Sequence, residues 1–184
     1  MSNDADSTPI ERSRTVTWED PLVGVAPAKT MSGLGYIQGL IDGSVPEPPT
    51  VNLMNMRPAS AEVGKVTFTC DPDESHYNPI GTVHGGRVCT LVDSVLDCVL
   101  GCAVQTTLPT GQGCTSLEIK ISYLRQVMAD TSRLTAVGMP RSRGAGPASP
   151  TAPCTTRTAS SSPPRAARSW SARSERAGVL RLAE

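Results

Sequence analysis

A histidine and two glycines, His84-Gly85-Gly86, precede a carboxylate, Asp93, near the middle of the chain. Apolar residues three and four positions apart follow Gly86, and this spacing predicts a helix that begins at the turn. A helix N-terminus carries unpaired N–H groups and a partial positive charge, and both suit an oxyanion. We therefore expect Gly85 to offer an oxyanion-binding N–H, with no side chain to block a substrate from the backbone. The alternative is that the two glycines only make a tight turn.

Asp93 lies two helical turns beyond the glycines, on a polar face that it shares with Thr90, Ser94 and Asp97. The remaining helix surface is apolar, which predicts that other parts of the chain surround the helix. A carboxylate on such a helix is a candidate general base or nucleophile. The alternative is a solvated polar position, and for Asp97 we expect a structural or channel-lining place.

The elements that must position these residues are a mixture of helices and strands. Helical spacing over residues 28–42 ends at Gly43, and an extended, proline-rich linker follows over residues 45–49. Residues 61–70 are rich in Val, Thr and Phe and predict one strand. Residues 114–127 alternate with period two and predict the clearest strand, and residues 133–139 begin the next.

Bulk properties narrow the function classes. A chain of 184 residues fits one domain with a sizeable core, and a formal net charge of zero argues against a nucleic-acid partner. We expect no signal peptide, no membrane span and a cytoplasmic location with six reduced cysteines. Cys98 and Cys102 lie four apart, but no CxxC pair accompanies them, so we expect no metal site. We expect His76 at the surface.

The last 45 residues differ from the rest. Residues 1–139 hold 9 basic and 15 acidic side chains, whereas residues 140–184 hold 8 and 2, and Arg, Ala, Ser, Pro, Thr and Gly make up 38 of those 45. No helical or strand period survives there, and we expect too little apolar surface to order the segment. It is either a natural basic tail or a GC-rich gene segment translated out of frame from about residues 137–141. We favour the second interpretation, and translation of the other two frames decides it.

Five short motifs, in this order and spacing, resemble the hotdog-fold acyl-CoA thioesterases of the phenylacetate-degradation (PaaI-like) type. The likeness runs from about residue 60 to residue 138. It comprises Asn78 six residues before the histidine, GTVHGG at residues 81–86, TLVD at residues 90–93, TSL at residues 115–117 and SYLR at residues 122–125. Gln126 stands where that family usually has proline.

The resemblance implies an α+β hotdog fold, with an antiparallel sheet wrapped around a long central helix. Residues 21–139 would form this domain with a helical lead-in, after a disordered N-terminus over residues 1–20 in which Trp18 is the first anchor. Residues 140–184 would form the tail, so we expect the last strands of the sheet to be missing. The family also implies a homodimer or a dimer of dimers, with the active site between protomers.

The resemblance implies roles for individual residues. Asp93 would attack an acyl-CoA thioester or activate water for that attack. His84 and Asn78 would orient the thioester or shape the loop. Ser116 would position water, in the family from across the dimer interface, although an ordinary strand hydroxyl is the alternative. Substrate contacts are expected from Gly86, Thr115 and the cation of Arg125, with no phosphate loop, no metal and no cofactor besides the coenzyme A of the substrate.

We therefore predict a hydrolase that splits an acyl-CoA thioester into a free acid and CoA. A non-catalytic acyl-CoA-binding module is the alternative from another class, and the carboxylate of Asp93 argues against it. A hotdog hydratase and an inactive frameshifted product are further alternatives. No membrane partner is expected.

Overall fold

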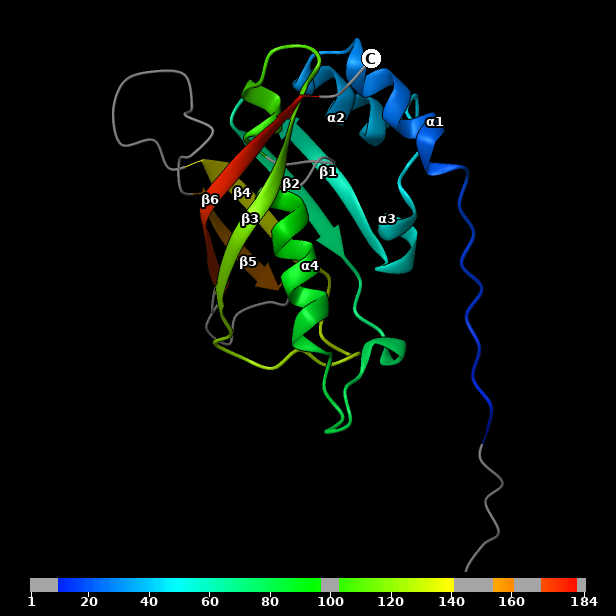
Figure 1. The fold of residues 1–184 in the computed structure, drawn as a ribbon. Helices are drawn as coiled ribbons and strands as arrows, with labels where there is room; N and C mark the ends of the chain where they lie inside the picture. Colours follow the sequence, from blue (N-terminus) through cyan, green and yellow to red (C-terminus); the bar gives the residue numbers. More distant parts are fainter. Residues whose placement is uncertain (1–9, 97–102, 141–153, 161–169, 182–184) are drawn as a thin grey trace, which may run out of the picture.

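The computed structural model describes residues 10–96, 103–140, 154–160 and 170–181 as one antiparallel sheet and its helices. The six strands are arranged in the order β1-β2-β4-β5-β6-β3, and the sheet wraps around helix α4 (Figure 1). This is the α+β hotdog architecture that the resemblance predicted. The strands are β1 (Met56–Glu62), β2 (Lys65–Cys70), β3 (Gln112–Ser122), β4 (Leu134–Pro140), β5 (Cys154–Ser160) and β6 (Trp170–Arg181).

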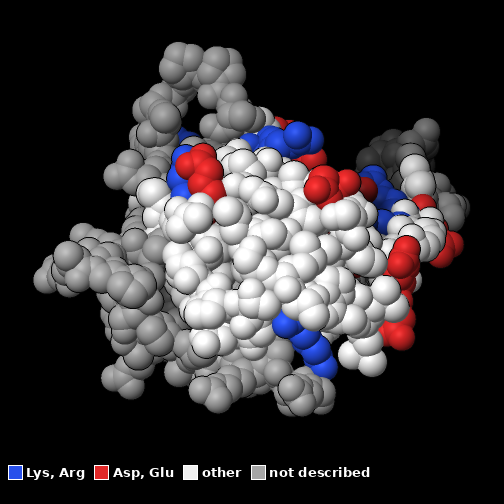
Figure 2. Space-filling view, turned by 90° about the horizontal axis from the view of Figure 1, so that it is seen from above, with Lys and Arg blue, Asp and Glu red and all other residues white. Residues whose placement is uncertain are grey.

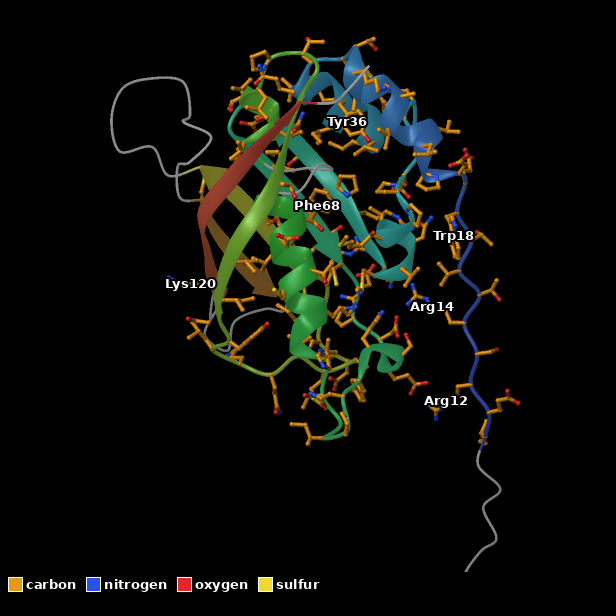
Figure 3. All side chains as sticks on the ribbon, in the orientation of Figure 1. Arg12, Arg14, Trp18, Tyr36, Phe68 and Lys120 are labelled. Carbon is orange, nitrogen blue, oxygen red and sulfur yellow. The ribbon has the colours of Figure 1, made fainter. Side chains whose placement is uncertain are left out.

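Helix α4 (Gly85–Leu96) lies in the concavity of the sheet and carries the main core (Figure 1). Its apolar residues Val88, Leu91 and Val95 belong to one buried cluster with Phe68 of β2, which is fully buried beside the helix (Figure 3). Val92, on another side of α4, packs against Ile119 and Ile121 of β3. Burial on two sides explains why the apolar face of this helix is so wide. The continuation expected beyond Leu96, with Asp97, Cys98 and Cys102, lies outside the described residues.

The strand predicted over residues 61–70 is instead the end of a hairpin. β1 and β2 pair in antiparallel fashion, with Glu62 opposite Lys65, and Val63 and Gly64 form the turn between them. Gly64 has a φ of 74°, a conformation that favours glycine. The prediction was wrong because the apolar alternation continues across this two-residue turn, so it hides the reversal of the chain.

The lead-in forms short helices at one end of the sheet (Figure 1). Helix α2 (Gly33–Asp42) confirms the predicted helix, although it starts later than residue 28, because the Ser32 hydroxyl accepts the Gly35 N–H and caps it there. It ends at Gly43, as predicted, with a φ of 80°. Two short α-helices and three 3-10 helices complete the described elements: α1 (Pro21–Val25), α3 (Pro49–Leu53), η1 (Ala26–Lys29), η2 (Glu74–His76) and η3 (Gln105–Thr107).

Residues 10–20 form an extended arm along one side of the molecule (Figure 3). Trp18 does not anchor it, because that residue is 56% exposed. Polar contacts hold the arm instead: Arg12 pairs with Glu74, and Arg14 donates to the carbonyl of Asn52 at 2.7 Å. These contacts place residues 10–20 against the domain, and the disorder expected for residues 1–20 stays a prediction.

The sheet continues beyond Pro140, contrary to the expectation that its last strands are missing. β5 pairs with β4, and β6 pairs with both β5 and β3. Backbone hydrogen bonds carry this pairing, and they need no apolar alternation of side chains. The three threonines at positions 155, 156 and 158 are β-branched residues typical of strands, and they were the available signal. Whether this segment is translated in its natural frame stays a prediction.

The end of the molecule that carries α1 and α2 presents a largely uncharged surface. Its described charged side chains, of both signs, stand in small separate groups (Figure 2). No continuous basic surface is visible there among the described residues. In the part of the chain that the structure describes, no helix is both long and apolar enough to cross a membrane.

Gly138 of β4 faces α4 so closely that a side chain would not fit. A Cβ atom placed there would lie 2.1 Å from the carbonyl oxygen of Val95. We predict that Gly138→Ala lowers the free energy of unfolding by about 1–3 kcal/mol, because it forces helix and sheet apart. Thermal or urea unfolding measures this. Met139→Ala, at an exposed neighbouring position, is the control, and equal stability of the two variants would contradict the close packing.

Candidate active site

The His84 turn positions the first residues of α4. Nδ1 of His84 accepts the Gly86 N–H at 2.9 Å, and the carbonyl of His84 accepts the Arg87 N–H at 2.9 Å. The His84 N–H itself donates to the carbonyl of His76 at 2.7 Å. One residue therefore satisfies two of the N–H groups that a helix start leaves without partners.

The Gly85 N–H makes none of the hydrogen bonds found among the described residues. It is the first N–H of α4, at the positive end of the helix. Gly85 is also partly exposed, so an acceptor atom from outside has access to it. The arrangement supplies what an oxyanion needs, a preoriented donor without a competing partner.

Asn78 orders the loop that leads to this turn. Its Oδ1 accepts the N–H groups of Ile80 and Thr82, both at 3.1 Å, and its Nδ2 donates to the Thr82 hydroxyl at 2.9 Å. The backbone N–H of Val83 then bonds the carbonyl of Val127 at 2.9 Å and ties the loop to the segment after β3. The contacts of Asn78 within the chain are thus those of a loop-ordering residue, and a contact with substrate stays a prediction.

Asp93 and Ser116 meet between α4 and β3. The hydroxyl of Ser116 donates to Oδ1 of Asp93, and both residues are partly buried. Because Ser116 is on β3 and Asp93 is on α4, the packing of Val92 against Ile119 and Ile121 holds this pair together. A hydroxyl beside a carboxylate can hold that carboxylate in one orientation or share a water with it.

Cys89 lies near Asp93 on one side and Tyr123 on the other. Burial raises the pKa of the Cys89 thiol, the negative charge of Asp93 raises it further, and a hydrogen bond with Tyr123 lowers it in part. Burial likewise raises the pKa of Tyr123, with a further contribution from Cys89. Both groups are therefore protonated at neutral pH. The sequence indicated no role for either residue, although Cys89 lies one helical turn before Asp93.

A cavity of about 410 Å³ opens beside the turn. It lies between the loop of residues 78–83, the first turn of α4 and residues 123–127, and Gly85 and Arg125 are among its lining residues. A larger hollow of about 630 Å³ lies between the N-terminal arm and residues 73–77, but none of the predicted site residues lines it. The chemistry of the smaller cavity makes it the better substrate site.

The structure divides the predicted residues into two groups. Asn78, His84, Gly85, Gly86 and Arg125 lie around the turn and its cavity, whereas Asp93 and Ser116 lie farther along α4. Asp93 follows Gly85 by eight residues (93 − 85), which at about 1.5 Å per residue separates them by roughly 12 Å along the helix.

Thr115 is adjacent to Ser116 on β3 and is exposed. It is not among the residues that line the cavity beside the turn.

Two residues behind the turn are more buried than the sequence suggested. The His76 side chain is only 8% exposed, contrary to the surface position expected for it, because it caps η2 through Asp73. Burial lowers the pKa of His76, and the nearby charge of Arg87 lowers it further.

The guanidinium of Arg87 is buried, and it donates to the Cys70 thiol and to the carbonyl of Met54. Hence the base of the loop is a packed polar cluster. Among the described residues, no three His, Cys, Asp or Glu side chains are close enough to hold a metal ion.

Solved structures of other proteins share this fold. A thioesterase family protein from Silicibacter pomeroyi superposes with a TM-score of 0.62 at 17% sequence identity, covering 79% of this chain and 99% of that one. The PaaI protein from the phenylacetic acid degradation operon of E. coli superposes with a TM-score of 0.58 at 14% identity, covering 83% and 97%. At these identities the likeness establishes the fold.

Part of the sequence also resembles a known protein family. Residues 80–145 match the family model described as the thioesterase superfamily. Human acyl-coenzyme A thioesterase 13 is 37% identical over 65 residues, which are 35% of this chain and 43% of the relative. The match thus spans less than half the length of that relative. The described chain therefore has a hotdog fold, and its residues 80–145 are similar to the thioesterase superfamily.

The reactivity of the Cys89 thiol reports the effect of the neighbouring Asp93 side chain on the Cys89 pKa. We predict that Asp93→Asn lowers the pKa of Cys89, because the substitution removes a negative charge that disfavours the thiolate. Alkylation of the Cys89 peptide by iodoacetamide, followed by mass spectrometry across a pH series, should be faster in the variant. Buried Cys114 provides the internal control. If the dependence of Cys89 alkylation on pH is the same in both proteins, then the Asp93 charge does not affect the Cys89 pKa, and the prediction is wrong.

Proposed function

We propose that the protein hydrolyses an acyl-CoA thioester to a free acid and CoA. The observation that carries the proposal is the Ser116–Asp93 pair, a hydrogen-bonded carboxylate between α4 and the sheet. The human relative is an acyl-coenzyme A thioesterase, which supports the substrate class. The absence of a phosphate-binding loop in the sequence leaves CoA recognition to scattered groups such as Arg125, which lines the cavity.

In the proposed reaction the Gly85 N–H binds the thioester carbonyl oxygen and stabilises the negative charge that develops there. Asp93 attacks the carbonyl carbon directly or removes a proton from an attacking water. Ser116 holds the carboxylate, or that water, in line. When water attacks, Asp93 passes the proton that it has taken to the departing thiolate, so that CoA leaves as the thiol and the free acid is released. When Asp93 attacks directly, CoA leaves first, and water then splits the acyl–Asp93 anhydride, releasing the acid and a proton that the thiolate takes up.

The length of α4 implies that these groups come from two chains. Direct attack brings a carboxylate within about 3–3.5 Å of the carbonyl carbon, while the donor lies roughly 3 Å from its oxygen. Gly85 and Asp93 of one chain, roughly 12 Å apart along the helix, are too distant to meet one carbonyl in this way. We therefore propose a homodimer, or a dimer of dimers, in which the turn of one protomer faces Asp93 of its partner.

Strand β3 offers a surface for that association. It is an outer strand of the six-stranded sheet, and its free edge can accept a second strand in the same way that an exposed edge recruits other chains. The strand carries Ser116 beside Asp93, so pairing through this edge would bring the carboxylate close to the interface. Sheet pairing between copies would therefore assemble the site.

We predict that Asp93→Asn lowers kcat for acyl-CoA hydrolysis by at least about a hundredfold, because the base or nucleophile is lost. Thiol release from short acyl-, phenylacetyl- and benzoyl-CoA measures it. Glu62→Gln is the matched control, since it also turns a carboxylate into an amide but lies on β1, at the opposite edge of the sheet.

The same assay separates the alternatives. Turnover by Asp93→Asn at the wild-type rate would remove Asp93 from the mechanism. A folded wild-type protein that binds acyl-CoA without releasing thiol would be the non-catalytic binding module. A chain that neither binds nor melts cooperatively would fit the inactive frameshifted product.

A further inference from the structure

Tyr123 makes a contact at the turn that the proposed reaction leaves unexplained. Its hydroxyl donates to the carbonyl of Gly85 at 2.9 Å, and its ring lies against the same glycine, 3.2 Å from where a Cβ atom would stand. Gly85 is thus fixed from the side of residues 123–127 as well as by its own helix. Tyr123 also lines the cavity beside the turn.

The Gly85 carbonyl belongs to the same peptide group as the Gly86 N–H, and that N–H donates to Nδ1 of His84 at 2.9 Å. The bonds therefore run in one direction, from the Tyr123 hydroxyl through the Gly85–Gly86 peptide to the His84 ring. A bond accepted by a peptide carbonyl polarises that peptide and strengthens the bond that its N–H donates.

A backbone N–H can only donate, so Nδ1 of His84 must accept and cannot carry a proton while this bond exists. In the neutral ring the proton then resides on Nε2. His84 is exposed, so the Nε2–H is open to the outside. This bond pattern makes His84 a hydrogen-bond donor rather than a base at Nδ1.

We propose that Tyr123 is a positioning residue that orients the Gly85–Gly86 peptide and thereby holds His84 in its Nε2–H tautomer for contact with the thioester. This inference rests on the proposed hydrolysis for the use of the turn, but the tautomer itself does not depend on turnover. Tyr123 belongs to the SYLR motif at residues 122–125, and the motif indicated no role for it.

The test is Tyr123→Phe, which keeps the ring and removes the hydroxyl. We expect kcat to fall about three- to tenfold with KM little changed, the range that loss of one neutral hydrogen bond gives. We also expect nitrogen-15 NMR of His84 to change from the Nε2–H tautomer to a mixture of both tautomers, because the less polarised peptide then donates a weaker hydrogen bond from the Gly86 N–H to Nδ1.

Tyr36→Phe is the matched control. The Tyr36 hydroxyl also donates to a glycine carbonyl, that of Gly24, at 3.0 Å, but it is buried between α1 and α2 (Figure 3). It should lower the melting temperature without altering kcat or the His84 tautomer. Comparing melting temperatures of the two variants separates a folding defect from a positioning effect.

Two results would overturn the proposal: an unchanged His84 tautomer in Tyr123→Phe, whatever its kcat, or an Nδ1–H tautomer in the wild type. The NMR measurement needs no substrate. If the wild-type protein has the expected tautomer, and loses it in Tyr123→Phe, yet hydrolyses no acyl-CoA, then the proposed function fails and the positioning of His84 stands.

Discussion

Helix α4 fixes the distance between the glycine turn and Asp93, and the rest of the candidate site depends on that distance. It begins at the glycine turn, it carries Asp93 two turns later, and its apolar sides lock it into the concavity of the sheet. Because the rise of an α-helix is constant, Gly85 and Asp93 of one chain stay roughly 12 Å apart along the helix. Packing cannot shorten this length, so a site that uses both groups on one carbonyl calls for a second copy.

Different parts of the chain hold the glycine turn and Asp93 in place. At the turn, the carbonyl of Val127 accepts the N–H of Val83 in the loop that follows Asn78, and the hydroxyl of Tyr123 donates to the carbonyl of Gly85. At Asp93, the hydroxyl of Ser116 reaches across from β3. β3 and the residues after it therefore contact α4 both at the glycine turn and at Asp93, so the proposed association through this edge strand would act on both parts of the candidate site.

Sequence predicted the parts whose signals are local. Helical spacing after Gly86 and strict alternation from Leu117 to Tyr123 located α4 and β3, and the order of motifs gave the hotdog fold. Sequence missed the β1–β2 hairpin because alternation ran through Val63 and Gly64. It also missed the burial of His76 and the contact of Tyr123, because both depend on residues far away in the chain.

The strands after Pro140 pair through their backbones, so a composition argument could not exclude them. The family match ends at residue 145, close to the change in composition, and the reading frame of the remainder stays a prediction.

The most direct test of a site shared between two chains is complementation between two inactive variants. Asp93→Asn keeps the turn and loses the carboxylate. Gly85→Pro keeps the carboxylate and loses only the first N–H of α4, a position where proline suits a helix. Gly85→Ala retains that N–H and controls for the added bulk beside Tyr123. Mixed oligomers purified through two different tags should regain acyl-CoA hydrolysis, to about half of the wild-type rate for a dimer with one restored site. Mixed oligomers as inactive as both parents, with Gly85→Ala still active, would contradict a site shared between protomers.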